Sequence, residues 1–211
     1  MTEAAGLAFP EPPMVGTPDC YRSYMARGAA AGDFDGDGDL DLFVARIGAA
    51  DLFFVNDGSG TFVEAAAAAG LDHEGASNAA LAFDLEGDGD LDLYVTALAP
   101  DVPRLYINDG SGRFAEEAAA RGALIAPGEC HAAWGASATD VDGDGDLDLH
   151  TTAWEAPFHR ERNDRARLLL NDGAGHFTDG TLEADLSTEG RSSFTSAFGD
   201  LDGDGDVDLA L

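Results

Sequence analysis

The stretch that decides the fold is Asp33-Phe-Asp-Gly-Asp-Gly-Asp-Leu-Asp41, because three near copies of it follow along the 211-residue chain. The copies begin at Asp84, Asp140 and Asp200, which spaces the four loops by 51, 56 and 60 residues. Each follows the pattern D-x-[DE]-G-D-G-D-x-D, and the second loop carries the one glutamate, Glu86. Self-similarity at a spacing of about 50 residues indicates an array of repeated structural units.

A second motif follows each of the first three loops. It is an Asn-Asp-Gly turn between apolar residues, found in Leu52–Phe62, Leu105–Phe114 and Leu168–Phe177. Asn, Asp and Gly tolerate positive φ, so these turns predict β-hairpins. The residues after each loop alternate in character, as in Asp41–Val44, which places Leu40, Leu42 and Val44 on one face of a strand.

Each unit is therefore expected to contain four short strands. The first precedes the acidic loop (27–32, 79–83, 132–139 and 194–199), the second follows it (40–44, 91–95, 147–151 and 207–211), and the last two flank the Asn-Asp-Gly turn. Such units are typical of β-propeller blades. A helical solenoid is the alternative, but the alanine-rich runs at 64–69 and 116–120 are too short for one.

The predicted fold class is all-β, with β-propeller blades of four antiparallel strands. The sequence predicts a partial propeller of three complete blades plus half of a fourth, as one repeat array over residues 1–211. The repeats lie at approximately 22–72, 73–125, 126–187 and 188–211, and the last is incomplete.

The spacing of carboxylates within each loop predicts a calcium site. Ca²⁺ takes roughly six to eight oxygen ligands, and carboxylates two residues apart converge when the chain curls tightly. Positions 1, 3 and 5 would supply side-chain oxygens, position 7 its backbone carbonyl, and position 9 would close the shell. Gly36 and Gly38 permit the curl, because glycine adopts backbone dihedrals that other residues resist. The predicted metal residues are Asp33, Asp35, Asp37, Asp39 and Asp41; Asp84, Glu86, Asp88, Asp90 and Asp92; Asp140, Asp142, Asp144, Asp146 and Asp148; and Asp200, Asp202, Asp204, Asp206 and Asp208.

Up to four Ca²⁺ ions, one per loop, are the expected cofactors. The longer side chain of Glu86 predicts an altered or weaker second site, and the fourth loop lies in an unfinished blade. Mg²⁺ fits less well, since it keeps several waters. An EF-hand would need an acid at position 12, where Val44, Val95, Thr151 and Leu211 stand. A solvated acidic turn explains any one loop, but not four copies in register.

The charge of the chain favours a cation as partner. It carries 41 acidic and 11 basic residues, for a formal net charge of −30, which would repel nucleic acid and anionic membranes. No apolar stretch is long enough for membrane insertion. Residues 1–13 lack the features of a secretory signal, so either the chain is not exported or its signal lies outside this sequence. Cys20 and Cys130 are expected either to bridge two connecting loops or to be free, partly buried thiols.

Two stretches of the sequence resemble a known family of repeats. Trp134-Gly-Ala-Ser-Ala-Thr-Asp140, leading into Val-Asp-Gly-Asp-Gly-Asp-Leu-Asp-Leu149, resembles the FG-GAP or VCBS repeat. Arg104-Leu-Tyr-Ile-Asn-Asp-Gly-Ser-Gly-Arg-Phe114 resembles the bacterial, ASPIC-associated branch. The resemblance implies integrin-α-like propeller blades with calcium in the hairpin loops. It also implies an extracellular, cell-surface or periplasmic location and roles in cell adhesion or recognition.

The chain has too few blades to close a ring by itself. Propellers of this family have about seven blades, whereas this sequence predicts three complete blades and half of a fourth. Thr2–Leu7 resembles the tail of a fourth strand, and residue 211 follows the second strand of the fourth unit. Either the chain is a fragment of a longer protein, or two copies complete a ring. Unpaired blade edges invite self-association.

No catalytic motif is present, so the protein is predicted not to be an enzyme. His150 occupies a strand position filled elsewhere by Phe43, Tyr94 and Ala210, which indicates packing. Trp134 is expected to be buried in a first strand, and the arginine-containing insert at 155–167 is either a solvated loop or a recognition loop. The leading function is a non-catalytic, calcium-binding module that recognises an unknown protein or glycan ligand. The alternative is a calcium-stabilised scaffold within a larger secreted carbohydrate-acting enzyme.

Overall fold

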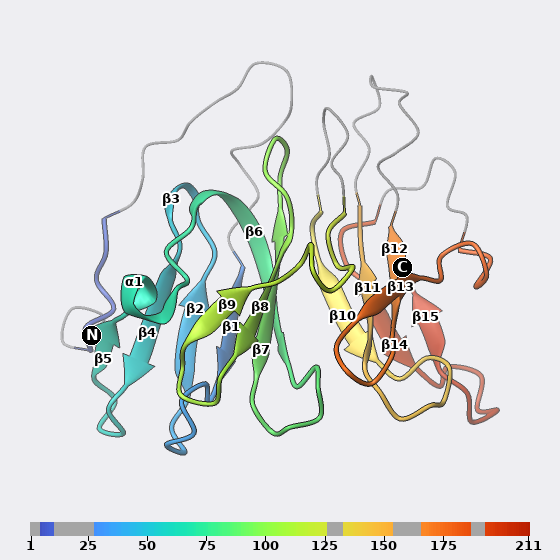
Figure 1. The fold of residues 1–211 in the computed structure, drawn as a ribbon, viewed down its shortest axis with the longest axis horizontal. Coiled ribbons are helices and arrows are strands. Elements are labelled where there is room, and N and C mark those ends of the chain that lie inside the picture. Colours follow the sequence, from blue (N-terminus) through green and yellow to red (C-terminus); the bar gives the residue numbers. More distant parts are fainter. Residues whose placement is uncertain (1–4, 11–27, 126–132, 154–165, 187–192) are drawn as a thin grey trace.

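Four antiparallel sheets follow one another along the chain and lie side by side (Figure 1). The computed structural model describes residues 5–10, 28–125, 133–153, 166–186 and 193–211. Cys20, Cys130, Trp154 and most of the insert at 155–167 lie outside the described residues, and so does the expectation about cysteine pairing.

The first and third sheets have the predicted four strands in sequence order. The first contains β1 (Ala29–Gly32), β2 (Asp41–Val44), β4 (Leu52–Asn56) and β5 (Phe62–Glu64). The third contains β10 (Ala136–Thr139), β11 (Asp148–Thr151), β12 (Arg167–Asn171) and β13 (Phe177–Asp179). The fourth has two strands, β14 (Ala197–Gly199) and β15 (Asp208–Ala210). The prediction of a partial propeller is confirmed.

The second sheet has a fifth strand, which the sequence does not predict. Its blade strands are β6 (Glu74–Phe83), β7 (Asp92–Ala97), β8 (Arg104–Asn108) and β9 (Phe114–Glu116). The first half of β6 pairs with β3 (Ile47–Ala50), with Ile47 opposite Ala76 and Ala50 opposite Glu74. Because β3 belongs to the first repeat, this pairing joins the first two blades through backbone hydrogen bonds.

The alanine-rich run of the first repeat forms one helical turn, α1 (Ala66–Ala69). It ends at Gly70, whose φ of 82° is a left-handed conformation favoured by glycine. Gly70 packs on the Phe114 carbonyl of the next blade, and Gly122 packs in the same way on Phe177. Gly6 has the same relation to Phe62, which supports the likeness of residues 5–7 to the end of a fourth strand. Within the described residues, no helix is long and apolar enough to cross a bilayer.

The hydrophobic core lies between neighbouring blades. Leu93 and Val95 of β7 pack in the cluster shared with the first blade, and Tyr94 between them packs in the cluster shared with the third. All six residues of β7 are buried for this reason. Leu40 lies one residue before β2 and is 63% exposed, although it was expected to share the face of Leu42 and Val44.

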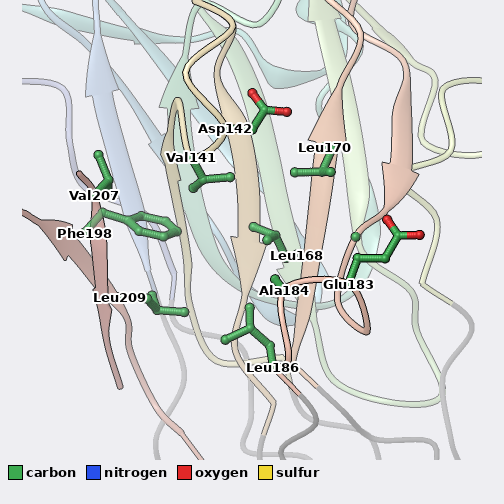
Figure 2. A pocket seen from close by; sticks show the side chains of 11 residues that line it. Val141, Asp142, Leu168, Leu170, Glu183, Ala184, Leu186, Phe198, Val207 and Leu209 are labelled. Atoms are coloured by element: carbon green, nitrogen blue, oxygen red, sulfur yellow. The ribbon is translucent and has the colours of Figure 1, made fainter.

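The two ends of the array are covered differently. At the first blade, the ring of Phe9 packs on Phe54 with 6.0 Å between centroids, and Arg46 lies over the Phe9 ring. At the other end, β12 and the two-stranded sheet line an open apolar pocket of about 320 Å³ (Figure 2). Its wall includes Leu168 and Leu170 on one side and Phe198, Val207 and Leu209 on the other. Self-association through open blade edges stays a prediction.

A buried carboxylate lies at the end of the first sheet opposite its Asn-Asp-Gly turn. Asp51 precedes β4 and is 1% exposed. It accepts hydrogen bonds from the Ser77 hydroxyl and the Arg46 amide, each at 2.7 Å. Burial raises the pKa of Asp51 to about 7, although these hydrogen bonds and the charge of Arg104 act in the opposite direction.

This carboxylate predicts a pH dependence of stability. Asp51 binds a proton more tightly in the native state than in the unfolded chain. The unfolding free energy of the protein therefore falls as pH rises from about 4 to about 7. The Asp51→Asn variant removes this contribution, which is on the order of 1.4 kcal/mol for each tenfold difference in proton affinity. We expect the difference in unfolding free energy between variant and wild type to change across this range in urea titrations. Parallel curves for the two proteins would contradict the assignment.

Candidate metal centre

Each acidic loop joins the first strand of a unit to the second, and all four lie along the lower edge of the view in Figure 1. The last aspartate of each loop is also the first residue of the second strand: Asp41, Asp92, Asp148 and Asp208. The sheet therefore fixes one end of every loop, and the remaining carboxylates are placed by the way the loop curls.

The first loop curls around the carboxylate at position 1. Asp33 Oδ1 accepts hydrogen bonds from the amides of Gly36 and Asp37, at 2.9 and 3.1 Å, and Oδ2 accepts one from Gly38 at 2.9 Å. Gly36 and Gly38 have φ values of 75° and 93°, which few residues other than glycine adopt. Asp140 and Asp200 are held in the same way by Gly143 and Gly145 and by Gly203 and Gly205.

This curl brings carboxylate oxygens together in three loops. One oxygen from each member lies within 4.8 Å of the others in the sets Asp33, Asp35 and Asp37; Asp140, Asp142 and Asp148; and Asp200, Asp202 and Asp208. Burial, followed by the neighbouring charge of Asp37, raises the pKa of Asp35. A bound cation would relieve this repulsion, so the residues present in these three loops fit a metal ion.

The carboxylate at position 9 ties the loop to the third strand. Asp148 Oδ2 accepts the amide of Val141 at 2.9 Å, and Oδ1 accepts the amide of Asn171 at 2.8 Å. Asp41 and Asp92 make the equivalent pairs of hydrogen bonds, and all three residues are at most 1% exposed. Asp208 accepts only the amide of Leu201 among the described residues, because its sheet has no third strand there.

The aspartate at position 7 faces the hairpin turn of its own blade. A Cβ added to Gly58, Gly110 or Gly173 would collide with the carboxylate of Asp39, Asp90 or Asp146 respectively. The turn aspartates Asp57, Asp109 and Asp172 instead accept hydrogen bonds from amides of their own turns. The hydrogen bonds from Ser59 lower the pKa of Asp57, which fits a turn-forming role.

The asparagine before each of the second and third turns reaches the loop of the preceding blade. Asn108 Nδ2 donates to the carbonyl of Phe34 at 2.8 Å, and Asn171 Nδ2 donates to that of Leu85 at 3.0 Å. Sequence reasoning assigned these asparagines to turns alone. Each asparagine also accepts an amide of its own turn with Oδ1, so one side chain binds both the turn and the neighbouring loop.

The second loop departs from the other three. Asp84 still accepts the amides of Asp88 and Gly89, at 3.1 and 3.0 Å. Glu86, however, forms a 2.6 Å ion pair with Arg121. Among the described residues, the carboxylate sets that could hold a metal lie in the first, third and fourth loops.

His150 and Trp134 both pack against the fourth repeat. His150 is 1% exposed, its Nδ1 lies 3.0 Å from Ser196 Oγ, and burial lowers its pKa to about 4, so it is neutral at pH 7. Trp134 is half-buried and stacks edge-on against Phe194 at 5.3 Å. It precedes β10, so its expected place within a first strand is wrong.

Fold and loops together define a partial β-propeller with an acidic loop between the first two strands of each repeat. A family model for the FG-GAP-like repeat matches residues 33–95, 84–151 and 158–211. The chain belongs to the FG-GAP-like repeat family, as its sequence predicted.

Solved structures to which the chain is similar include a lectin and two rhamnogalacturonan lyases. An Agrocybe aegerita lectin that recognises non-reducing terminal N-acetylglucosamine is 20% identical, with a TM-score of 0.45 over 89% of this chain and 46% of its own. The rhamnogalacturonan lyase YesW is 18% identical, and a Bacillus licheniformis rhamnogalacturonan lyase is 17% identical. Their TM-scores are 0.48 and 0.47, each over 89% of this chain and 40% of the other. The chain thus spans less than half the length of these structures. A search of curated proteins found no match.

Proposed function

We propose that this protein is a calcium-binding β-propeller module that recognises a protein or glycan ligand and has no catalytic activity of its own. The observation that carries the proposal is the convergence of three carboxylates in each of three loops. Their oxygen-only donors suit a hard cation, and the larger, flexible coordination shell of Ca²⁺ suits loops with five carboxylates better than that of Mg²⁺.

The metal would act through folding. A bound Ca²⁺ supplies positive charge where Asp33, Asp35 and Asp37 repel one another, and so fixes the loop between β1 and β2. Because Asn108 connects the first loop, at the carbonyl of Phe34, to the turn of the next blade, a fixed first loop also supports the contact between these two blades. Calcium binding is therefore proposed to stabilise the array on which a recognition surface is displayed.

The proposed location is extracellular, at the cell surface or in the periplasm. Calcium sites of extracellular modules bind in the range of roughly 10⁻⁴ to 10⁻³ M. At least one carboxylate of each loop is exposed to solvent, which suits sites filled from a calcium-rich medium. The absence of catalysis is supported by His150, the histidine considered above, which is buried and neutral.

Binding of the purified chain to a glycan array, in calcium and in chelator, tests recognition. We expect calcium-dependent binding to at least one glycan class, and the Asp33→Asn and Asp140→Asn double variant should bind less. Calcium binding without retention of any glycan or protein ligand would contradict the recognition role and favour a scaffold role in a larger enzyme. Isothermal titration with Ca²⁺ and Mg²⁺ separately tests the choice of metal.

A further inference from the structure

The glutamate of the second loop forms an ion pair with a residue outside its loop. Glu86 Oε1 lies 2.6 Å from Arg121 Nη2, and Arg121 Nε donates to Glu117 Oε2 at 2.7 Å. The side chain of Arg121 is only 12% exposed. One guanidinium is therefore held between two carboxylates.

The same arginine reaches the third blade. Arg121 Nη1 donates to the carbonyls of Ala174 and Gly175, at 3.1 and 3.4 Å, in the turn between β12 and β13. The backbone carbonyl of Arg121 accepts the amide of Phe177 at 2.7 Å. A Cβ at Gly175 would collide with Arg121 Nη1 and crowd Glu86, so glycine leaves the space that the ion pair occupies.

The three residues of this cluster all differ from their counterparts in the other repeats. Aligned on the phenylalanine of each fourth strand, Arg121 corresponds to Ala69 in the first unit and Ala184 in the third. Glu117 corresponds likewise to Ala65 and Gly180. Where no arginine is present, position 3 of the loop is aspartate. Glu86, Glu117 and Arg121 each differ from their counterparts in the other units, and ion pairs join both glutamates to the arginine.

The second loop also differs from the others in its backbone hydrogen bonds. In the other three loops, the amide of the glycine at position 4 donates to the first aspartate, as Gly36 does to Asp33. Among the described residues, which include the whole second loop, Gly87 makes no such bond to Asp84. The carboxylate at position 3 is instead directed to a fixed positive charge that would repel a divalent ion.

We infer that the second loop is not a calcium site like the other three, because the Glu86 carboxylate pairs with the Arg121 guanidinium instead of a metal ion. The Glu86–Arg121–Glu117 ion pairs then hold the second blade against the third without metal. This inference rests on the proposed calcium function for its comparison with the other loops, whereas the ion-pair contact stands without it.

Metal stoichiometry tests the inference directly. Native mass spectrometry and isothermal titration of chelator-treated protein should give three Ca²⁺ ions for the wild type. The triple variant Glu86→Asp, Glu117→Ala, Arg121→Ala restores the residues of the first unit and should bind four. The control Arg113→Ala, which removes an exposed arginine of the same blade, should stay at three. Four ions in the wild type, or three in the triple variant, would overturn the inference.

Thermal melts separate this inference from the proposed function. Arg121→Ala should lower the melting temperature by about 3 °C or more, equally in calcium and in chelator. If the wild type binds no calcium at all, the proposed function fails, and an equal loss in both buffers still supports the ion-pair contact. A melting temperature unchanged by Arg121→Ala overturns that contact.

Discussion

Removal of calcium is expected to lower the melting temperature more than any substitution proposed above. A ligand that binds only the native state adds about 2.7 kcal/mol per site when its concentration is 100 times the dissociation constant. Three such sites would contribute about 8 kcal/mol, which is comparable with the whole stability of an ordinary domain. For a chain of this length, the loss corresponds to a decrease on the order of 15–30 °C.

The sign of this effect follows from the loops themselves. The carboxylates of Asp33, Asp35 and Asp37 stand close together in the native state, and the whole chain carries a formal charge of −30. Without a cation their repulsion is relieved by unfolding. The binding energy of the ion therefore becomes folding energy.

Differential scanning calorimetry in excess calcium and in excess chelator measures the effect. High sodium chloride in chelator is the control, because it screens charge without occupying a site and should restore only part of the lost stability. The double variant Asp33→Asn, Asp35→Asn should reduce the calcium-induced shift by about one third, since it disables one of three sites. An unchanged melt after confirmed removal of metal would contradict a structural role for calcium.

The strands beside the acidic loops could be predicted from sequence because each depends on local residues. The position of β11, for example, follows from the alternation after Asp148, and the hairpin after it follows from Asn171-Asp-Gly. The four-stranded order also follows, because short connections join neighbouring strands. The two strands of the fourth unit follow likewise from the residues on either side of its acidic loop.

The contacts between repeats could not be predicted, because they depend on residues far apart in sequence. The strand β3 has the sequence Ile-Gly-Ala-Ala, which lacks the alternation that indicates a strand, and forms through pairing with β6. Asn171 donates to a carbonyl 86 residues earlier, at Leu85. Glu86 was recognised as unusual, but its partner Arg121 lies 35 residues away in an alanine-rich run with no pattern of its own.

Substitution of Asp92 is expected to destabilise the protein strongly whether or not calcium is present. Asp92 is 1% exposed, and its two oxygens accept the amides of Leu85 and Asn108 at 3.1 and 2.8 Å. Asp92→Ala leaves both amides buried without an acceptor, at a cost of about 1–3 kcal/mol each. We therefore expect a loss of about 2–6 kcal/mol in unfolding free energy.

Asp92 separates the structural role of position 9 from metal binding, because the second loop is inferred to hold no calcium. The loss of unfolding free energy caused by Asp92→Ala should be the same in calcium and in chelator. The loss caused by Asp148→Ala should be larger in calcium than in chelator, since Asp148 belongs to a carboxylate set that could hold a metal. Burial raises the pKa of Asp92 to about 6. A neutral side chain is thus tolerated better than a missing acceptor, and Asp92→Asn should cost less than Asp92→Ala.

Urea denaturation in both buffers measures these differences. Asp88→Ala is the matched control, because it removes an exposed carboxylate from the same loop and should cost less than about 1 kcal/mol. If Asp92→Ala were no more destabilising than Asp88→Ala, the two buried hydrogen bonds would not hold the loop to the third strand. If its cost appeared only in calcium, Asp92 would be acting as a metal ligand, and the second loop would be a calcium site after all.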